Sequence, residues 1–178
     1  MEIERHKLFY KEKTMITVGE IMIRDVVTLK TSDSILKARK IMMNSNIRHL
    51  PIVDADGKLA GLVTQRDLLK IENSEIDSIN IDEHRNMESS ITLESIMMKQ
   101  VHTVSEKDSL RAAGLELQRH KFGCLPVVKQ DHVIGIITDT DFVGVAINLI
   151  EQEDEMEDID GSMVDDFTTN TYDQTSLL

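Results

Sequence analysis

The chain has 178 residues, of which 40% are hydrophobic, so it can form one ordinary domain or two small ones and is not disordered as a whole. Its net charge of −12, from 20 basic and 32 acidic side chains, argues against binding to nucleic acid or to an anionic membrane surface. It has a single cysteine, no apolar run long enough to cross a membrane, and a charged N-terminus without a signal-peptide core, so we expect a cytoplasmic protein.

After a charged N-terminal extension, residues 1–14, the chain contains one unit twice. The recurring segments are 34–38 (SILKA) with 109–113 (SLRAA), 50–53 (LPIV) with 125–128 (LPVV), and 61–67 (GLVTQRD) with 135–141 (GIITDTD). The offset is 75 positions for the first two pairs and 74 for the third, because the second copy lacks one turn residue. Both prolines of the chain, Pro51 and Pro126, occupy the same position of the repeat.

Each copy predicts the same order of elements. A helical turn ends at Met22 or Met97, a short strand covers 26–29 or 101–104, and a helix begins near 32–33 or 108. Two β-rich runs and a last helix follow. In the first copy the runs are 50–53 and 59–64, and the turn 54–58 between them holds an Asp-Gly pair, which is typical of hairpins.

This order predicts an α/β (α+β) fold of two tandem β-α-β-β-α repeats related by pseudo-twofold symmetry. Each repeat alone is of marginal size for one core, so we expect the two sheets to pack against each other and hide their apolar faces from water. The expected boundaries are 15–70 for the first repeat, 71–91 for a polar linker with room for some helix, and 92–150 for the second repeat.

Residues 151–178 form an acidic tail. They include ten acids and no Lys or Arg, so they carry about −10 of the net charge of −12 and leave the repeats nearly neutral. Such a composition predicts a solvating, disordered segment. An interaction or self-masking tail is the alternative, since scattered apolar residues in it could be buried by a partner that the sequence does not identify.

The duplicated unit resembles the tandem cystathionine-β-synthase (CBS) domain pair, or Bateman module, over roughly residues 15–150. The two LP[IV]V strands and the two G-[LI]-[VI]-T-x-x-D ends carry the resemblance. It implies two clefts between the sheets that bind adenine nucleotides or related adenosyl ligands. It also implies pairing into a homodimer and a regulatory role without catalysis.

The T-x-x-D ends, Thr64/Asp67 and Thr138/Asp141, lie where a strand turns into a helix. Free N–H groups and the positive end of the helix dipole attract phosphate there. The Thr hydroxyl can bond a phosphate or ribose oxygen, and the Asp can accept the ribose hydroxyls. The alternative is structural, because Thr is an ordinary N-cap and an acid in the first turn suits the helix dipole.

The resemblance also implies an apolar adenine wall near the first strand and the LP strand. The candidates are Met22, Val26, Ile47 and Pro51 in the first copy and Met97, Val101, Phe122 and Pro126 in the second. Residues of this kind at such spacing can equally be core.

The candidate phosphate contacts are Arg24, Arg48, His49, Arg66 and Lys99. The second copy offers fewer cations and adds Asp139, and an added carboxylate opposes phosphate. We therefore expect two inequivalent sites, of which the one using Arg66 binds the more phosphorylated ligand. The sequence leaves open how each cleft draws on the two repeats.

Catalytic and metal-ligating residues are not expected. Cys124 lies in an apolar strand and is interpreted as a core or cleft-wall residue. The histidines show no close ligand spacing, so no metal site is predicted, and whether Mg²⁺ accompanies the ligand stays open. The function we expect is an adenine-nucleotide sensor that controls an unknown protein target. The alternative is a structural dimerisation module without a ligand.

Overall fold

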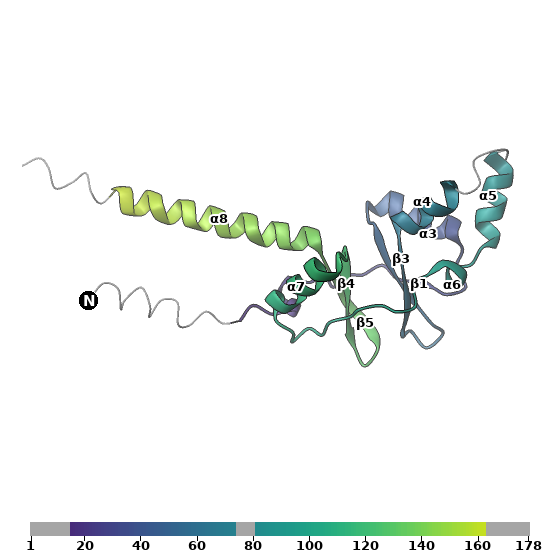
Figure 1. The fold of residues 1–178 in the computed structure, drawn as a ribbon, viewed down its shortest axis with the longest axis horizontal. Helices are drawn as coiled ribbons and strands as arrows, with labels where there is room; N and C mark the ends of the chain where they lie inside the picture. Colours follow the sequence, from purple (N-terminus) through teal and green to yellow (C-terminus); the bar gives the residue numbers. More distant parts are fainter. Residues whose placement is uncertain (1–14, 74–80, 163–178) are drawn as a thin grey trace, which may run out of the picture. The chain divides into compact units, whose positions relative to one another are not determined.

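The structure, a computed structural model, describes residues 15–73 and 81–162. The described residues divide into two compact units, of which the first ends at Asp139 and the second begins at Thr140. The first repeat contains α2 (Val18–Ile21), β1 (Leu29–Lys30), α3 (Ile35–Ser45), β2 (His49–Val53), β3 (Leu59–Thr64) and α4 (Gln65–Asn73) (Figure 1). The following elements are α5 (Ile81–Ser90), α6 (Leu93–Ile96), α7 (Leu110–His120), β4 (Cys124–Lys129), β5 (His132–Thr138) and α8 (Asp139–Ser162).

The short helices α2 and α6 end where the sequence predicts, with Met22 and Met97 as their C-caps. The longer helices α3 and α7 begin after Ser34 and Ser109, whose hydroxyls accept hydrogen bonds from the backbone N–H groups three residues on. A serine at this position satisfies a donor that the helix itself leaves free. The predicted helix starts, near 32–33 and 108, are therefore early by two or three residues.

Two antiparallel hairpins form the centre of the repeats. In the first, Leu50 pairs with Val63, and in the second, Leu125 pairs with Ile137. The first turn needs glycine, because Gly57 has φ 80°. The shorter second turn places Gln130 and Asp131 at positive φ, as a tight hairpin turn requires.

The predicted first strands are shorter and later than expected. Among the described residues, Leu29 and Lys30 alone pair in parallel with β2, and in the second copy a single bridge joins Val104 to Val127. The residues before β1 pair with the other repeat instead of with their own sheet, because Ile23 forms a bridge with Ile136 of β5. The start of each repeat crosses to the other repeat before it returns to its own sheet.

The crossing is reciprocal and shows the pseudo-twofold symmetry. Ile23 pairs with Ile136, and the equivalent residues Met98 and Leu62 also pair. The bridge of Thr17 with Ser109 is likewise matched by that of Thr92 with Ser34. Leu62 of β3 packs with Cys124 and Ile136 of the other hairpin in one buried cluster, so the two sheets pack against each other as predicted.

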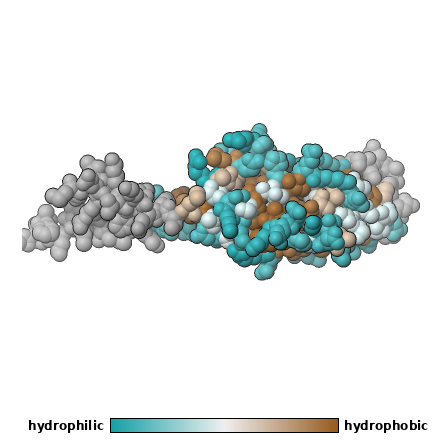
Figure 2. Space-filling view, turned by 90° about the horizontal axis from the view of Figure 1, so that it is seen from below, coloured by the Kyte–Doolittle hydropathy of each residue, from teal (hydrophilic) through white to brown (hydrophobic). Residues whose placement is uncertain are grey.

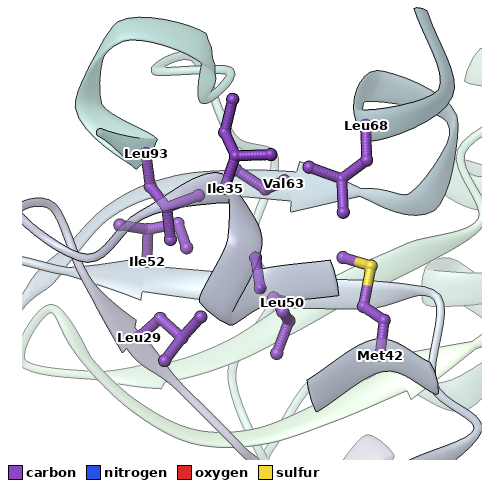
Figure 3. Packing of buried hydrophobic residues seen from close by; sticks show 9 residues of the cluster. Leu29, Ile35, Met42, Leu50, Ile52, Val63, Leu68 and Leu93 are labelled. Carbon is purple, nitrogen blue, oxygen red and sulfur yellow. The ribbon is translucent and has the colours of Figure 1, made fainter. Parts of the chain in front are cut away.

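The core of the first repeat lies between its sheet and helices α3 and α4. Its buried side chains include Leu50, Ile52 and Val63 from the strands and Leu68 from α4 (Figure 3). Leu93 from α6 completes this cluster although it belongs to the second repeat. The core of the first repeat therefore depends on the start of the second repeat. On the face shown in Figure 2, apolar residues lie among hydrophilic ones.

The predicted linker contains helix α5, which packs against α3 (Figure 1). The two helices are joined by an ion pair in which Arg39 Nε lies 2.8 Å from Glu88 Oε1. Glu88 is only 4% exposed. A buried carboxylate is tolerated when a cation and hydrogen bonds compensate it, and Arg39 supplies both.

The last helix, α8, is longer than expected. The sequence places the end of the second repeat at residue 150 and a disordered tail after it, whereas α8 continues to Ser162. The rest of the predicted tail, 163–178, and the extension 1–14 lie outside the described residues. Among the helices that the structure describes, none is long and apolar enough to cross a membrane.

Candidate ligand-binding cleft

A cavity of about 590 Å³ lies in the first unit, where the ends of the two repeats meet. Both repeats line it. The first contributes Arg48, His49, Leu62, Thr64, Gln65, Arg66 and Leu69, and the second contributes Met98, Val101, His102, Lys121, Phe122, Gly123, Cys124 and Asp139.

The crossed start of the second repeat explains this mixture. The backbone of Met98 exchanges hydrogen bonds with Leu62 at 2.9 and 3.0 Å, next to the end of β3. Val101 and His102 follow three and four residues later and form part of the cleft wall. The structure thus settles how this cleft draws on the repeats: Thr64 comes from the first copy and its apolar wall largely from the second.

Backbone contacts fix the cationic side of the cleft. The Gln65 N–H donates to the Arg48 carbonyl at 2.9 Å, which holds the start of α4 beside the start of β2. The equivalent bond, from the Asp139 N–H to the Gly123 carbonyl, is 3.2 Å long. Lys121 ends α7 in a left-handed conformation with φ 56°, and the chain then turns Phe122 toward the cleft.

Six of the predicted site residues meet in this cavity. They are Thr64, Arg48, His49, Arg66, Val101 and Phe122. Arg48, Arg66 and Lys121 give the lining three fixed positive charges against one negative charge, that of Asp139. The positive excess and the adjacent N-terminus of α4 suit an anionic group.

Thr64 and Asp67 form a closed N-terminal cap on α4. The Thr64 N–H and Oγ1 both donate to Asp67 Oδ2, at 3.0 and 2.7 Å, and the Asp67 N–H donates to Thr64 Oγ1 at 3.3 Å. Burial acts to raise the pKa of the Asp67 carboxyl, but the bonds from Thr64 and Lys70 outweigh it and leave that pKa below its ordinary value. In this structure Thr64 and Asp67 therefore act as the N-terminal cap of α4, and Asp67 lies outside the cavity lining.

Five predicted wall residues are buried or partly buried and lie outside the lining of this cavity. Pro51 and Pro126 are less than 2% exposed, and Met22 is 7% exposed. Ile47 and Met97 pack against the first core. Close approach explains the two methionines, because a Cβ on Gly135 would lie 2.4 Å from Met22 Sδ and one on Gly61 2.5 Å from Met97 Sδ.

The remaining predicted residues are not among those that line the cavity. Val26 packs with the cluster between the sheets, and Arg24 donates to the Gly19 carbonyl at 2.9 Å. Lys99 lines a second hollow of about 320 Å³ near the hairpin turns. Thr138 ends β5, and Asp141 lies in the first turn of α8, in the second unit.

His49 and Gly123 face each other inside the cleft. A Cβ on Gly123 would lie 2.6 Å from His49 Nε2, so the absence of a side chain at Gly123 makes room for the imidazole. Burial lowers the pKa of the His49 imidazole, Asp139 acts to raise it, and Arg48 lowers it further, so that it lies below its ordinary value.

Cys124 is a wall residue of the cleft. It is 4% exposed, and burial, reinforced by Asp139, raises the pKa of its thiol to about 12. The thiol is therefore protonated at neutral pH, and only the thiolate is strongly nucleophilic. This agrees with its interpretation as an inert wall residue.

Several lining residues were missing from the prediction. Lys121 and Gly123 flank Phe122 directly, and Met98 and His102 flank the segment of Val101. The signal that could have found them is the duplication itself. In this structure the neighbours of Val101 and Phe122, which are predicted wall residues of the second copy, lie near Thr64 in the T-x-x-D end of the first copy.

Comparisons with known proteins agree with the duplicated fold. The CBS-domain family model matches residues 18–74 and 93–148, one match in each repeat. A homoserine O-acetyltransferase of Methanohalobium evestigatum is 36% identical over 125 residues, or 70% of this chain. The chain spans only 23% of that relative's length.

Solved structures match over most of their own length. A Vibrio cholerae protein assigned to acetoin utilization, AcuB, is 39% identical with a TM-score of 0.67, covering 80% of this chain and 98% of that one. A CBS domain pair in complex with 5′-methylthioadenosine and S-adenosyl-L-methionine is 29% identical with a TM-score of 0.65, covering 76% and 98%. The protein CBSX2 in complex with AMP is 26% identical with a TM-score of 0.63, covering 75% and 98%.

Proposed function

Because this chain belongs to the CBS-domain family, with one domain in each repeat, we propose that it is a regulatory module that binds an adenosyl ligand in the cleft at Thr64. The observation that carries the proposal is the make-up of the lining, in which an apolar wall meets three cationic side chains and a helix N-terminus. The complexes of similar CBS pairs with AMP and with S-adenosyl-L-methionine support it.

In this proposal the adenine ring lies against Val101 and Phe122, which are both half-buried in the wall. Phosphates lie toward Arg48, Arg66 and Lys121, whose charges favour each added phosphate. The ligand thus spans the cleft from its apolar second-repeat side to its cationic side.

Asp67 can reach a ribose only by changing its present bonds. Its Oδ2 is held by Thr64, and its Oδ1 lies 3.3 Å from Lys70 Nζ. We expect a ribose hydroxyl to replace Lys70 at Oδ1, since Lys70 is mostly exposed and can return to water at little cost. The cap on α4 then stays intact while the ligand binds.

The second T-x-x-D end, Thr138/Asp141, forms the other site of the proposal. The two sites are inequivalent, and the one with Arg66 takes the more phosphorylated ligand, because Thr140 stands at the position equivalent to Arg66. The predicted wall residues outside the lining then have an indirect role, because they pack beneath the backbone that carries the lining side chains. They are Met22, Ile47, Pro51, Met97 and Pro126.

Regulation follows if the ligand binds two states of the module with different affinity. We propose that ligand binding changes the conformation or the assembly of a cytoplasmic homodimer, without catalysis, and that a partner protein reads this change. Mg²⁺ enters only as a companion of a bound polyphosphate.

Isothermal titration calorimetry of the full chain tests the proposal. AMP, ADP, ATP and S-adenosylmethionine are titrated into the wild type and the variants Arg66→Gln, Asp67→Ala and Asp141→Ala. Arg111→Gln, an exposed arginine on α7 outside the cleft lining, is the matched control. We expect saturable binding that Arg66→Gln weakens more for ATP than for AMP and that Arg111→Gln leaves unchanged.

Two results would overturn the proposal. No heat and no rise in melting temperature with any ligand at millimolar concentration would favour a ligand-free dimerisation module, because a ligand that binds only the folded state must stabilise it. Equal losses for AMP and ATP in both aspartate variants would contradict the inequivalence of the two sites.

A further inference from the structure

A cluster of two histidines and one carboxylate lies beside the cleft. His102 Nδ1 is 2.9 Å from Glu116 Oε1, and His120 Nε2 is 3.4 Å from the same oxygen. One ligand atom from each residue lies within 4.8 Å of the other two. Neither the sequence patterns nor the proposed nucleotide site assigns a role to these three residues together.

The fold brings the cluster together in two steps. Glu116 and His120 are four residues apart on α7, so both project from one face of the helix. His102 comes from the crossed segment, two residues before the bridge of Val104 with Val127. No short histidine motif announces the cluster, because one ligand lies on a different element from the other two.

Phe122 orients both imidazole rings. Its ring stacks on His120, with centroids 5.2 Å apart and planes 13° apart, and it lies 4.8 Å from the ring of His102. The two histidines are therefore held in place before any ligand arrives. A metal site gains affinity from such ordering, since less side-chain freedom is lost on binding.

We propose that His102, Glu116 and His120 bind one divalent transition-metal ion of the zinc class. Zinc lies about 2.0–2.2 Å from histidine nitrogens and carboxylate oxygens, so tetrahedral ligand atoms are roughly 3.3 Å apart. Two of the three separations are close to this value, and small side-chain rotations close the third. Two imidazoles favour zinc, nickel or copper over Mg²⁺ and Ca²⁺, which take oxygen ligands.

The site leaves a coordination position open. The side chains of His102, His120 and Glu116 are 49%, 39% and 32% exposed, so an ion can enter and water can complete its shell. His102 and Phe122 also line the nucleotide cleft. The fourth position can therefore accept an anionic group of a ligand in that cleft, but metal binding itself does not depend on the nucleotide proposal.

The first repeat lacks an equivalent cluster. Val27, Ile41 and Ser45 occupy the positions that correspond to His102, Glu116 and His120. Valine and isoleucine offer no ligand atoms, and a lone serine is a weak one. We therefore expect one metal ion per chain. If each repeat carried such a cluster, two ions per chain would bind.

Titration of Zn²⁺ alone into the full chain tests the site, after chelator dialysis and removal of any polyhistidine tag. We expect one ion per chain, and a loss of affinity of about tenfold or more in His102→Ala, His120→Ala and Glu116→Gln. His132→Ala is the matched control, because His132 is exposed on β5 and bonded to the Gln130 carbonyl. Circular dichroism verifies that each variant is folded.

Co²⁺ provides a second measurement on the unaltered protein. A four-coordinate site with two imidazoles gives intense visible absorption, which we expect to saturate at one equivalent and to be displaced by Zn²⁺. Weak octahedral absorption, or the absence of saturable Zn²⁺ binding, would overturn the proposal. So would one-to-one binding that survives in both histidine variants, because the ion would then lie elsewhere.

Discussion

The two repeats agree where their side chains are buried and differ where they meet the cleft. Leu50 and Leu125 are equivalent and fully buried. At the cleft, Arg48 and His49 of the first repeat correspond to Gly123 and Cys124 of the second. All four of these residues line the same cavity, so symmetric backbones produce an asymmetric site.

The difference separates what maintains the fold from what selects a ligand. Interior positions keep apolar residues of similar size, since close packing tolerates little change in volume. Positions at the cleft differ in charge between the two repeats, since Arg48 and Arg66 have the uncharged counterparts Gly123 and Thr140. The ligand specificity of this protein is therefore to be sought at the positions where its two halves diverge.

The largest expected effect concerns the buried positions at which the two repeats agree. Leu50→Ala and Leu125→Ala should each lower the free energy of unfolding by about 2–5 kcal/mol, because each leaves a cavity in a closed core. Urea unfolding measures both. A loss below about 1 kcal/mol for one variant alone would show that the two cores are not equivalent in packing.

The next effect tests the asymmetric half. Arg66→Gln removes a charge-assisted bond to phosphate, which costs about 1.5–3 kcal/mol, or roughly tenfold to 150-fold in affinity for ATP. Calorimetry measures the loss, with Arg111→Gln as its control. A loss equally large in Arg111→Gln would mean that overall charge, and not the cleft, governs binding.

A smaller effect concerns the cap on α4. Asp67→Asn should lower the free energy of unfolding by about 1 kcal/mol at pH 6. The pKa of Asp67 in the folded state lies below its ordinary value of 3.8, so its contribution is full above that value and is lost as the pH falls through the folded pKa.

The difference between wild type and Asp67→Asn should therefore shrink on acidification below pH 3.8. Urea unfolding of both proteins at pH 6 and at a pH below 3.8 measures this difference in the free energy of unfolding. Asp25→Asn, at an exposed position, is the control and should show little change at either pH. A difference that is the same at low pH would show that Asp67 acts without its charge.

The smallest effect on stability concerns Gly123. Alanine there forces His49 aside, since the new Cβ would lie 2.6 Å from Nε2, but the imidazole can rotate and the cost should stay within about 1 kcal/mol. Affinity for AMP should fall about fivefold, or about 1 kcal/mol, as the cleft narrows.

Gly144→Ala on α8 is the matched control for Gly123→Ala, because a Cβ there meets nothing within 4 Å. The melting temperature measures the stability of both variants, and titration with AMP measures their affinity for the ligand. Unchanged AMP affinity in Gly123→Ala would place the ligand away from His49.

Most of the fold could be predicted from the duplication. The equivalent positions of the two prolines aligned the repeats and so located both hairpins, and the apolar period and capping residues predicted α3 and α7. The first strands were predicted too early because strand propensity cannot reveal that Ile23 pairs with the other repeat. The length of α8 was missed because acidic composition argues for disorder even where the chain is helical.

The candidate site could be predicted only in part. Thr64, Arg66 and Phe122 were identified from the repeat and from the family resemblance, but only the tertiary structure shows that they line one cavity. Pro51 and Pro126 mark the register of the fold and lie in its interior. The cluster of His102, Glu116 and His120 is invisible in sequence, because only tertiary structure brings its two segments together.

Photoaffinity labelling tests the central claim, that an adenosyl ligand occupies this cleft, most directly. The full chain is irradiated with 8-azido-ATP, with and without excess ATP, and the labelled peptides are mapped by mass spectrometry. The account predicts adducts within residues 98–102 or 121–124, which line the cleft, and predicts that ATP suppresses them. Labelling confined to other segments, or labelling that ATP does not suppress, would contradict it.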